Sequence, residues 1–126
     1  MAGADYSPLV IEHFERPRNT GRFEPAADVI EGRAGRPEQG CEFHVSARVG
    51  HDALIAVRIS VYGCPHCIAA ASWLSERLAG LGQQDLAAWS WREAAEALDV
   101  PAEKRGRMLI LEDAVRHLAE AWRQRA

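Results

Sequence analysis

Alternating hydrophobic and polar residues predict a strand hairpin in the middle of the chain. Across residues 41–49 the side chains alternate, and one face carries Cys41, Phe43, Val45, Ala47 and Val49. The other face carries Glu42, His44, Ser46 and Arg48. Turn-forming residues at 50–52 lead into a second β-rich run at 54–62, so we expect an antiparallel pair. Residues 28–34 are a weaker candidate for an edge strand.

Helical spacing predicts the elements on either side of this hairpin. Ser7 before Pro8 is typical of a helix start, and that helix should end before Pro17. A short helix is expected at 91–98, with Ser90 as its cap. Two apolar stripes at spacings of three and four residues predict further helices: Ile68, Ala71, Leu74, Leu78 and Leu81, then Met108, Leu111, Val115, Leu118 and Trp122. The expected order is one helix, a small antiparallel sheet of about three strands and then three helices. This order predicts an α+β fold.

Composition limits the classes of partner. The 126 residues are 48% hydrophobic and 26% charged, which fits a single domain over 1–126. A net charge of -3 gives no reason to expect binding to nucleic acid, and no stretch approaches the ~20 apolar residues of a membrane span. No secretion signal is visible, and the three cysteines suit a reducing compartment. We therefore expect a cytoplasmic protein without a membrane partner.

The sharpest chemical feature is the motif Cys64-Pro65-His66-Cys67, between a predicted strand and a predicted helix start. Unpaired N–H groups and the helix dipole at such a position favour the thiolate. Two thiols at this spacing can bind a metal ion or close a disulfide. The motif alone does not distinguish zinc, iron–sulfur and redox proteins.

The hairpin brings a third cysteine towards this motif. Cys41 starts the first strand, so it should lie at the same end of the ladder as Tyr62 and Gly63, next to Cys64. Three thiolates and one further donor suit zinc or an iron–sulfur cluster, and His66 is the nearest candidate for the fourth ligand. His44 should face the other way. The sequence shows no phosphate loop, no Ser/His/Asp order and no paired-carboxylate motif, so we do not expect an enzyme.

Four segments match the pattern of a known family. They are residues 6–21, Gly35-Arg36-Pro37, Val61-Tyr62-Gly63-Cys64 and Leu111-Glu112-Asp113-Ala114. In these segments the chain resembles the IscU/NifU N-terminal-type scaffolds, which assemble a two-iron, two-sulfur cluster on cysteines. The resemblance implies cysteine desulfurase and apo-protein clients as partners. It also implies the IscU/NifU-like fold.

The resemblance also shows an altered ligand set. Cys64 occupies the position of the family's second cysteine. Gln39 occupies the position of the family's first cysteine, and Cys41 occupies that of the aspartate in the loop that carries this first cysteine. Gly106 and Arg107 fall at the family's His-Cys pair. Since Cys41 and Cys67 are additional thiols, we expect Cys41, Cys64 and Cys67 to form a substitute set for iron or the cluster.

Several alternatives remain open from the sequence. The same residues could hold zinc, the chain could be a metal-free homologue that acts as an interaction partner, or Cys64 and Cys67 could perform thiol–disulfide exchange. By the resemblance, residues 98–104 correspond to the segment that an Hsp70-type chaperone binds in the family. Glu103 stands where that segment has an apolar residue, so we do not expect transfer of the cluster through this chaperone. A homodimer sharing a site is compatible with the incomplete ligand set.

Overall fold

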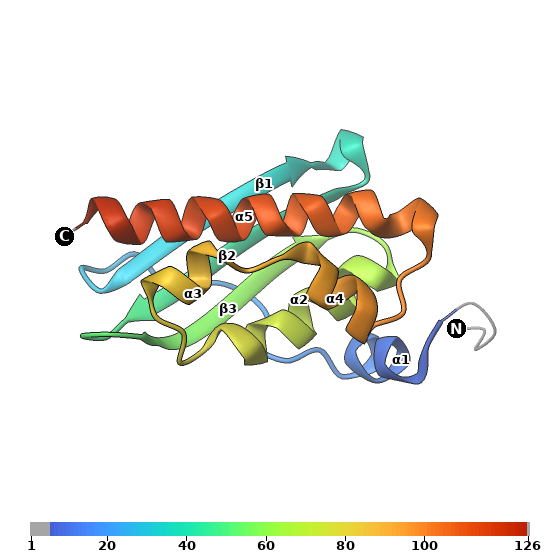
Figure 1. The fold of residues 1–126 in the computed structure, drawn as a ribbon, viewed down its shortest axis with the longest axis horizontal. Helices are drawn as coiled ribbons and strands as arrows, with labels where there is room; N and C mark the ends of the chain where they lie inside the picture. The colour runs from blue at the N-terminus through green and yellow to red at the C-terminus, as the bar shows by residue number, and fades with distance from the viewer. Residues whose placement is uncertain (1–5, 126) are drawn as a thin grey trace.

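An antiparallel sheet in the order β1-β2-β3 is the centre of the computed structural model, which describes residues 6–125 (Figure 1). Its strands are β1 (Val29–Arg36), β2 (Cys41–Val49) and β3 (Leu54–Tyr62). The helices are α1 (Pro8–Glu15), α2 (Pro65–Leu78), α3 (Gln83–Ala87), α4 (Trp91–Ala97) and α5 (Arg105–Gln124), with short 3-10 turns η2 (Pro37–Gln39) and η3 (Ala102–Lys104). Within these residues, no helix is long and apolar enough to cross a membrane.

The α+β prediction is confirmed, and the hairpin has the expected partners. β2 pairs antiparallel with β3, so that Glu42 lies opposite Tyr62. The weak edge-strand candidate is β1, which continues to Arg36. The helix α3 was not predicted, because five residues give no periodic stripe and its stability comes from packing on α5.

Local capping explains where α1 and α4 begin. Ser7 Oγ accepts a hydrogen bond from the Val10 N–H at 3.3 Å, and Pro8 follows at the first helical position. The same hydroxyl donates to the Leu98 carbonyl at 2.8 Å, which ties the start of α1 to the end of α4. Ser90 Oγ accepts from the Arg92 N–H in the same way at the start of α4.

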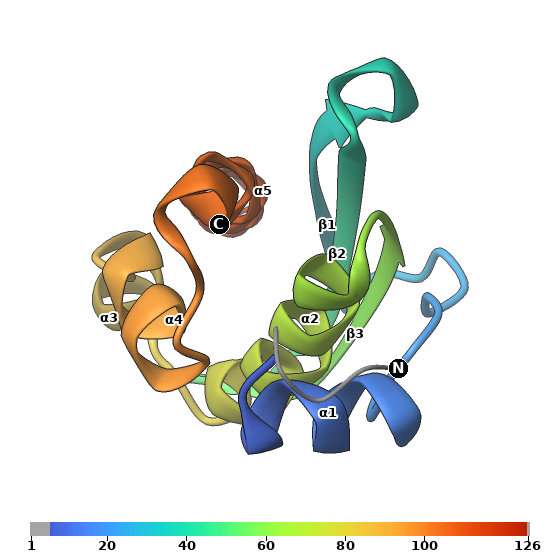
Figure 2. The same ribbon diagram turned by 90° about the vertical axis from the view of Figure 1, so that its right-hand side faces the viewer.

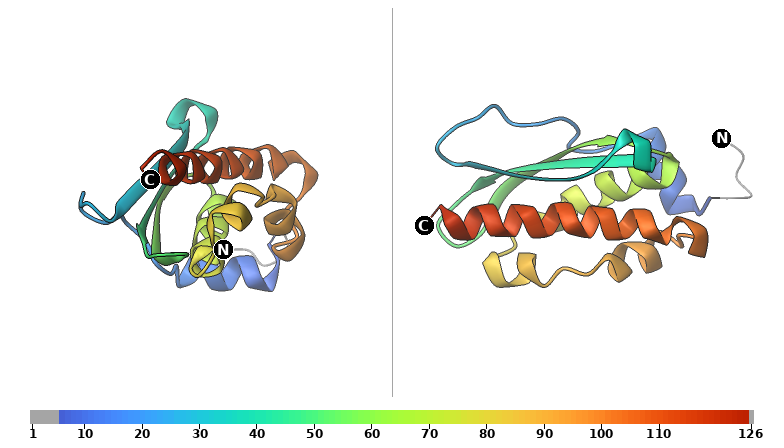
Figure 3. Two further views of the ribbon diagram at one scale, coloured as in Figure 1. Left: turned by 60° about the vertical axis from the view of Figure 1, so that its left-hand side comes forward. Right: turned by 90° about the horizontal axis from the view of Figure 1, so that it is seen from above.

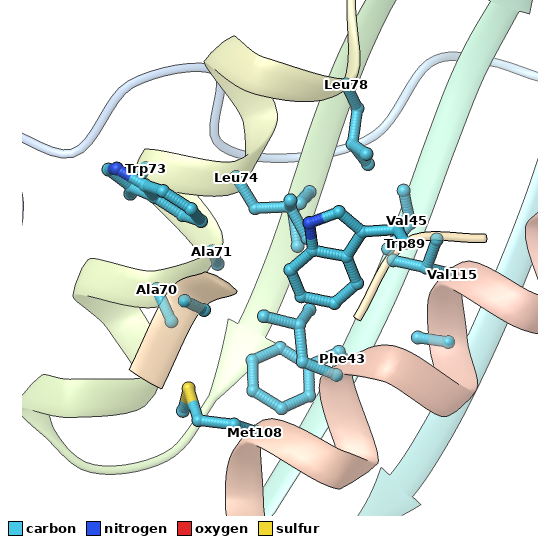
Figure 4. Packing of buried hydrophobic residues seen from close by; sticks show 14 of the residues in the cluster. Phe43, Val45, Ala70, Ala71, Trp73, Leu74, Leu78, Trp89, Met108 and Val115 are labelled. Atoms are coloured by element: carbon cyan, nitrogen blue, oxygen red, sulfur yellow. The ribbon is translucent and has the colours of Figure 1, made fainter. Parts of the chain in front are cut away.

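The core lies between one face of the sheet and the helices α2 and α5 (Figures 2 and 4). β2 contributes Phe43, Val45 and Ala47, and all three are fully buried. The whole predicted stripe of α5 is buried on the same side of the sheet, including Met108. Figure 4 shows the Trp89 indole in the middle of the drawn side chains, with Phe43 and Met108 towards one end of them. Burial of these side chains supplies most of the driving force for folding.

Helix α2 is buried on nearly all sides, which a single apolar stripe does not anticipate. Its outer side faces α1, and polar contacts join the two helices. His13 Nδ1 lies 2.8 Å from Ser72 Oγ. The Arg18 N–H, just after α1, donates a hydrogen bond to the same Ser72 Oγ at 2.8 Å. Burial, aided by the Arg18 guanidinium, lowers the pKa of His13. His13 therefore packs between helices as a neutral side chain.

The segment between α1 and β1 covers the opposite face of the sheet (Figure 3). Asn19 accepts from the Ile59 N–H at 2.9 Å, beside an isolated parallel bridge between Thr20 and Ile59 at the outer edge of β3. The chain then crosses the face, where the Phe23 N–H donates to Ser46 Oγ at 3.0 Å. This cover explains why His44 and Ser46, on the polar side of β2, are buried.

Candidate functional site

Four elements bring chemically active residues to one end of the molecule. Cys41 is the first residue of β2, and Cys64 is the residue before α2, separated from the end of β3 by Gly63 alone. Cys67 lies in the first turn of α2. The start of α5 lies at the same end (Figures 1 and 3). All three cysteines are free thiols.

The three thiols gather around Gly63. A Cβ atom placed on Gly63 would lie 2.7 Å from Cys67 Cβ, 2.9 Å from Cys67 Sγ and 3.1 Å from Cys41 Cβ. The sulfur atoms of Cys64 and Cys67 are 3.7 Å apart. Cys41 and Cys67 are fully buried, whereas Cys64 is partly exposed. Glycine is therefore required at position 63 for the close approach of β2 and α2.

Arg107, near the start of α5, places a guanidinium group beside these thiols. Its Nη2 atom would be 2.9 Å from a Cβ on Gly40, so the side chain lies over the loop that precedes Cys41. The same guanidinium interacts with Cys64 and Cys67. We call Cys41, Cys64, Cys67 and Arg107 the thiol site. The sequence indicated Arg107 as the occupant of a family ligand position, but its side-chain direction depends on the packing of α5.

The environment divides the thiols into one anionic and two neutral groups. Cys64 and Cys67 share a sulfur–sulfur hydrogen bond in which either thiol can donate. Donation from Cys67, together with the first-turn N–H groups and Arg107, lowers the pKa of Cys64 to about 4. The same hydrogen bond, together with burial, raises the pKa of Cys67. Burial is also the main cause that raises the pKa of Cys41. Cys64 is thus the nucleophilic thiolate of the site at neutral pH.

The other candidate ligands lie elsewhere. The buried His66 ring packs against Tyr6, with ring centroids 4.9 Å apart, and His66 Nε2 has no hydrogen-bond partner among the described residues. His44 lies on the opposite face of the sheet, where His44 Nε2 is 2.6 Å from Glu31 Oε1. Gln39 is exposed at the end of η2. Within residues 6–125, no three His, Cys, Asp or Glu side chains form a group that could hold a metal ion as they are arranged.

The reactivity of Cys64 should depend on the hydrogen bond from Cys67. Because that donor stabilises the thiolate, alkylation of Cys64 by iodoacetamide should vary little between about pH 6 and about pH 8. Replacing the donor in Cys67→Ala should move the midpoint of the alkylation profile upwards, towards the ordinary cysteine pKa of about 8.5. Cys67→Ser keeps a donor and is the matched control. A Cys67→Ala midpoint equal to that of the wild type would contradict this account of the shift.

Comparison with known proteins shows which family this chain is similar to. The family model described as NifU-like N terminal domain matches residues 5–126. The iron-sulfur cluster assembly scaffold protein IscU of Escherichia coli K12 is 31% identical over 113 residues, covering 88% of each chain. The IscU protein of Rickettsia prowazekii is 30% identical, covering 95% of this chain and 93% of the relative. A bifunctional NifU/MnmA protein of Rubrobacter xylanophilus is 36% identical over 93% of this chain and 24% of its own length.

Solved structures support the same fold. A NifU-like N-terminal protein from Brucella abortus has a TM-score of 0.71 at 14% identity and covers 95% of both chains. A putative SUF-system scaffold from Fervidobacterium islandicum has a TM-score of 0.66 at 13% identity and covers 94% of this chain and 99% of its own. The match over the whole described length, the sequence identity to IscU proteins and the shared α+β fold agree. The chain belongs to the NifU-like N-terminal domain family of iron–sulfur cluster assembly scaffolds.

Proposed function

We propose that this chain binds iron or a two-iron, two-sulfur cluster through Cys41, Cys64 and Cys67 and passes it to other proteins. The observation that carries the proposal is the convergence of the three thiols around Gly63. Thiolates are the usual ligands of iron–sulfur clusters. The family supports cluster assembly as the general role, and the thiol site provides residues for it. In this proposal the chain binds and carries its cargo and is not an enzyme.

Loading the site requires a rearrangement of its side chains. Cys41 and Cys67 are neutral and buried, and they must lose protons to ligate iron. The Arg107 guanidinium offsets part of the negative charge that three thiolates would bring together. Because iron in such clusters is four-coordinate and His66 packs against Tyr6, the remaining donor would come from a second molecule. A client protein or a second copy of this chain could supply it.

The proposal also assigns classes of partner and a compartment. Sulfur would come from a cysteine desulfurase, and apo-proteins would receive the cluster, as the family's general role suggests. Three free thiols without a disulfide suit the reducing cytoplasm. Glu103, exposed in η3, replaces the apolar residue that a chaperone groove would take, so chaperone handover is not part of the proposal.

Anaerobic reconstitution with iron and sulfide tests the ligand assignment. The wild-type chain should retain iron and acid-labile sulfide in roughly equal amounts after desalting. Cys64→Ala should lose nearly all of both, because it removes the partly exposed thiolate through which metal would enter. Gln39→Ala, at the position of the family's first cysteine, is the matched control and should bind as the wild type does.

The other outcomes distinguish the competing functions. Retention of zinc without sulfide would identify a zinc-stabilised relative. Retention of no metal by any variant would identify an interaction partner that has lost the cargo. Loss of cluster in Gln39→Ala with retention in Cys64→Ala would contradict the thiol site as the ligand set.

A further inference from the structure

The pair Cys64 and Cys67 has a geometry that cluster binding alone does not require. Their sulfur atoms are 3.7 Å apart, and a disulfide bond of about 2.05 Å would need them to approach by only about 1.7 Å. Both residues sit at the start of one helix, three positions apart, so a small side-chain rotation brings the sulfurs together. The pair can therefore exist as two thiols or as one disulfide.

The two sulfurs differ in access to solvent. Cys64 is partly exposed, whereas Cys67 lies behind it with no exposed surface, between Gly63 and Cys41. An incoming reagent therefore reaches Cys64 first. A group attached to the Cys64 sulfur would project towards solvent, and Cys67 would face the same sulfur from the interior. Thiol–disulfide exchange requires that the attacking thiol reach the sulfur that carries the group, and Cys67 Sγ lies 3.7 Å from Cys64 Sγ.

From this arrangement we propose that Cys64 and Cys67 form an internal reductant that converts a sulfur atom delivered to Cys64 as a persulfide into free sulfide. The inference deepens the proposed function and rests on it, because sulfide is what cluster assembly consumes. The donor is a persulfide of a protein or of a small thiol. Arg107 lies beside the Cys64 sulfur and would stabilise the negative charge of the persulfide formed there.

The reaction has two balanced steps. First, the Cys64 thiolate attacks the outer sulfur of the donor persulfide; the bond between the donor's two sulfurs breaks, and the donor leaves as a thiolate. Second, Cys67 attacks the Cys64 sulfur; a Cys64–Cys67 disulfide forms, the bond to the delivered sulfur breaks, and that sulfur leaves as hydrosulfide with the proton of Cys67. Overall, two thiols lose two electrons and the delivered sulfur gains them. An external dithiol then restores the pair by exchange.

A single-turnover experiment with glutathione persulfide tests the proposal. The fully reduced chain is mixed anaerobically with this probe, without iron and without another reductant, and released sulfide is measured above the protein-free background. The wild type should release about one sulfide per chain and then stop, with the Cys64 and Cys67 peptides linked by a disulfide. Added dithiol should restart the release.

Three variants separate the two steps. Cys67→Ser should accumulate a persulfide on Cys64, seen by mass spectrometry as one added sulfur atom, with sulfide release at background. Cys64→Ser should form no persulfide. Gln39→Ser, at an exposed residue of η2 outside the thiol site, is the matched control and should release sulfide as the wild type does.

Two results would overturn the inference. One is full sulfide release by a folded Cys67→Ser. The other is a wild-type chain that holds a stable Cys64 persulfide without forming the disulfide, and this measurement needs no variant to fold. Reconstitution with supplied sulfide does not need the persulfide. A chain that binds cluster in the reconstitution but releases no sulfide from glutathione persulfide would therefore reject this inference and keep the proposed function.

Discussion

Replacing Gly32 by alanine is expected to destabilise the protein by about 3 kcal/mol or more. Gly32 lies in β1 directly beneath α5, where a Cβ would collide with the Ala114 carbonyl oxygen and the Leu118 backbone. Backbone atoms cannot rotate away as a side chain would, so α5 must move off the sheet. That movement would open the core along the whole buried stripe of α5.

Urea unfolding measures this effect. The midpoint of Gly32→Ala should fall markedly, or the variant should already be unfolded without urea. Gly106→Ala is the matched control, since a Cβ there meets nothing within 4 Å and the residue lies in the first turn of α5. Alanine is also the better helix former by up to about 1 kcal/mol, so this control should be as stable as the wild type or more so. Equal midpoints for the two variants would contradict the close packing of α5 on β1.

Restoring the family ligands with Gln39→Cys, Cys41→Asp and Arg107→Cys is expected to raise cluster binding several-fold. The structure places these positions together, because Arg107 lies over Gly40 and beside Cys64. A thiol at 107 would therefore lie beside Cys64, and a thiol at 39 would lie next to Gly40, in the loop that Arg107 covers. The substitutions also remove the Arg107 guanidinium, so the control must remove it without adding thiols.

Iron and acid-labile sulfide retained after reconstitution measure the gain. The control carries Gln39→Ser, Cys41→Asp and Arg107→Ser, which makes the same changes in size and charge without adding thiols. If the gain comes from ligation, only the cysteine variant should show it. An equal gain in both would mean that removal of the Arg107 charge is sufficient, and no gain in either would count against the assignment of positions 39 and 107.

Local sequence signals were sufficient to predict most of the fold. The Ser7-Pro8 cap, the alternation of β2 and the apolar stripe of α5 are each determined by residues close in sequence. Two features depend on distant packing and were not predicted. These are the short helix α3, which is stabilised by α5, and the burial of α2 on the side that α1 covers.

The same distinction applies to the thiol site. Hairpin register alone predicted that Cys41 would approach Cys64, since strand pairing fixes which residues share one end of the sheet. The depth of Cys67 and the direction of Arg107 depend on how α2 and α5 sit on that sheet, and sequence patterns carry no information on it. His66 illustrates this limit, because its neighbour is Tyr6, which lies sixty positions earlier in the chain.

The bridge between Thr20 and Ile59 has a consequence for association between sheets. By lying along the outer side of β3, the segment before β1 shields one of the two margins at which a further strand could add. Strand addition would then have to occur along β1. That margin carries the exposed charged residues Glu31, Arg33 and Arg36, and charged side chains on an edge strand disfavour the addition of a further strand. The sheet is thereby protected from edge-to-edge aggregation while its thiol end stays open to partners.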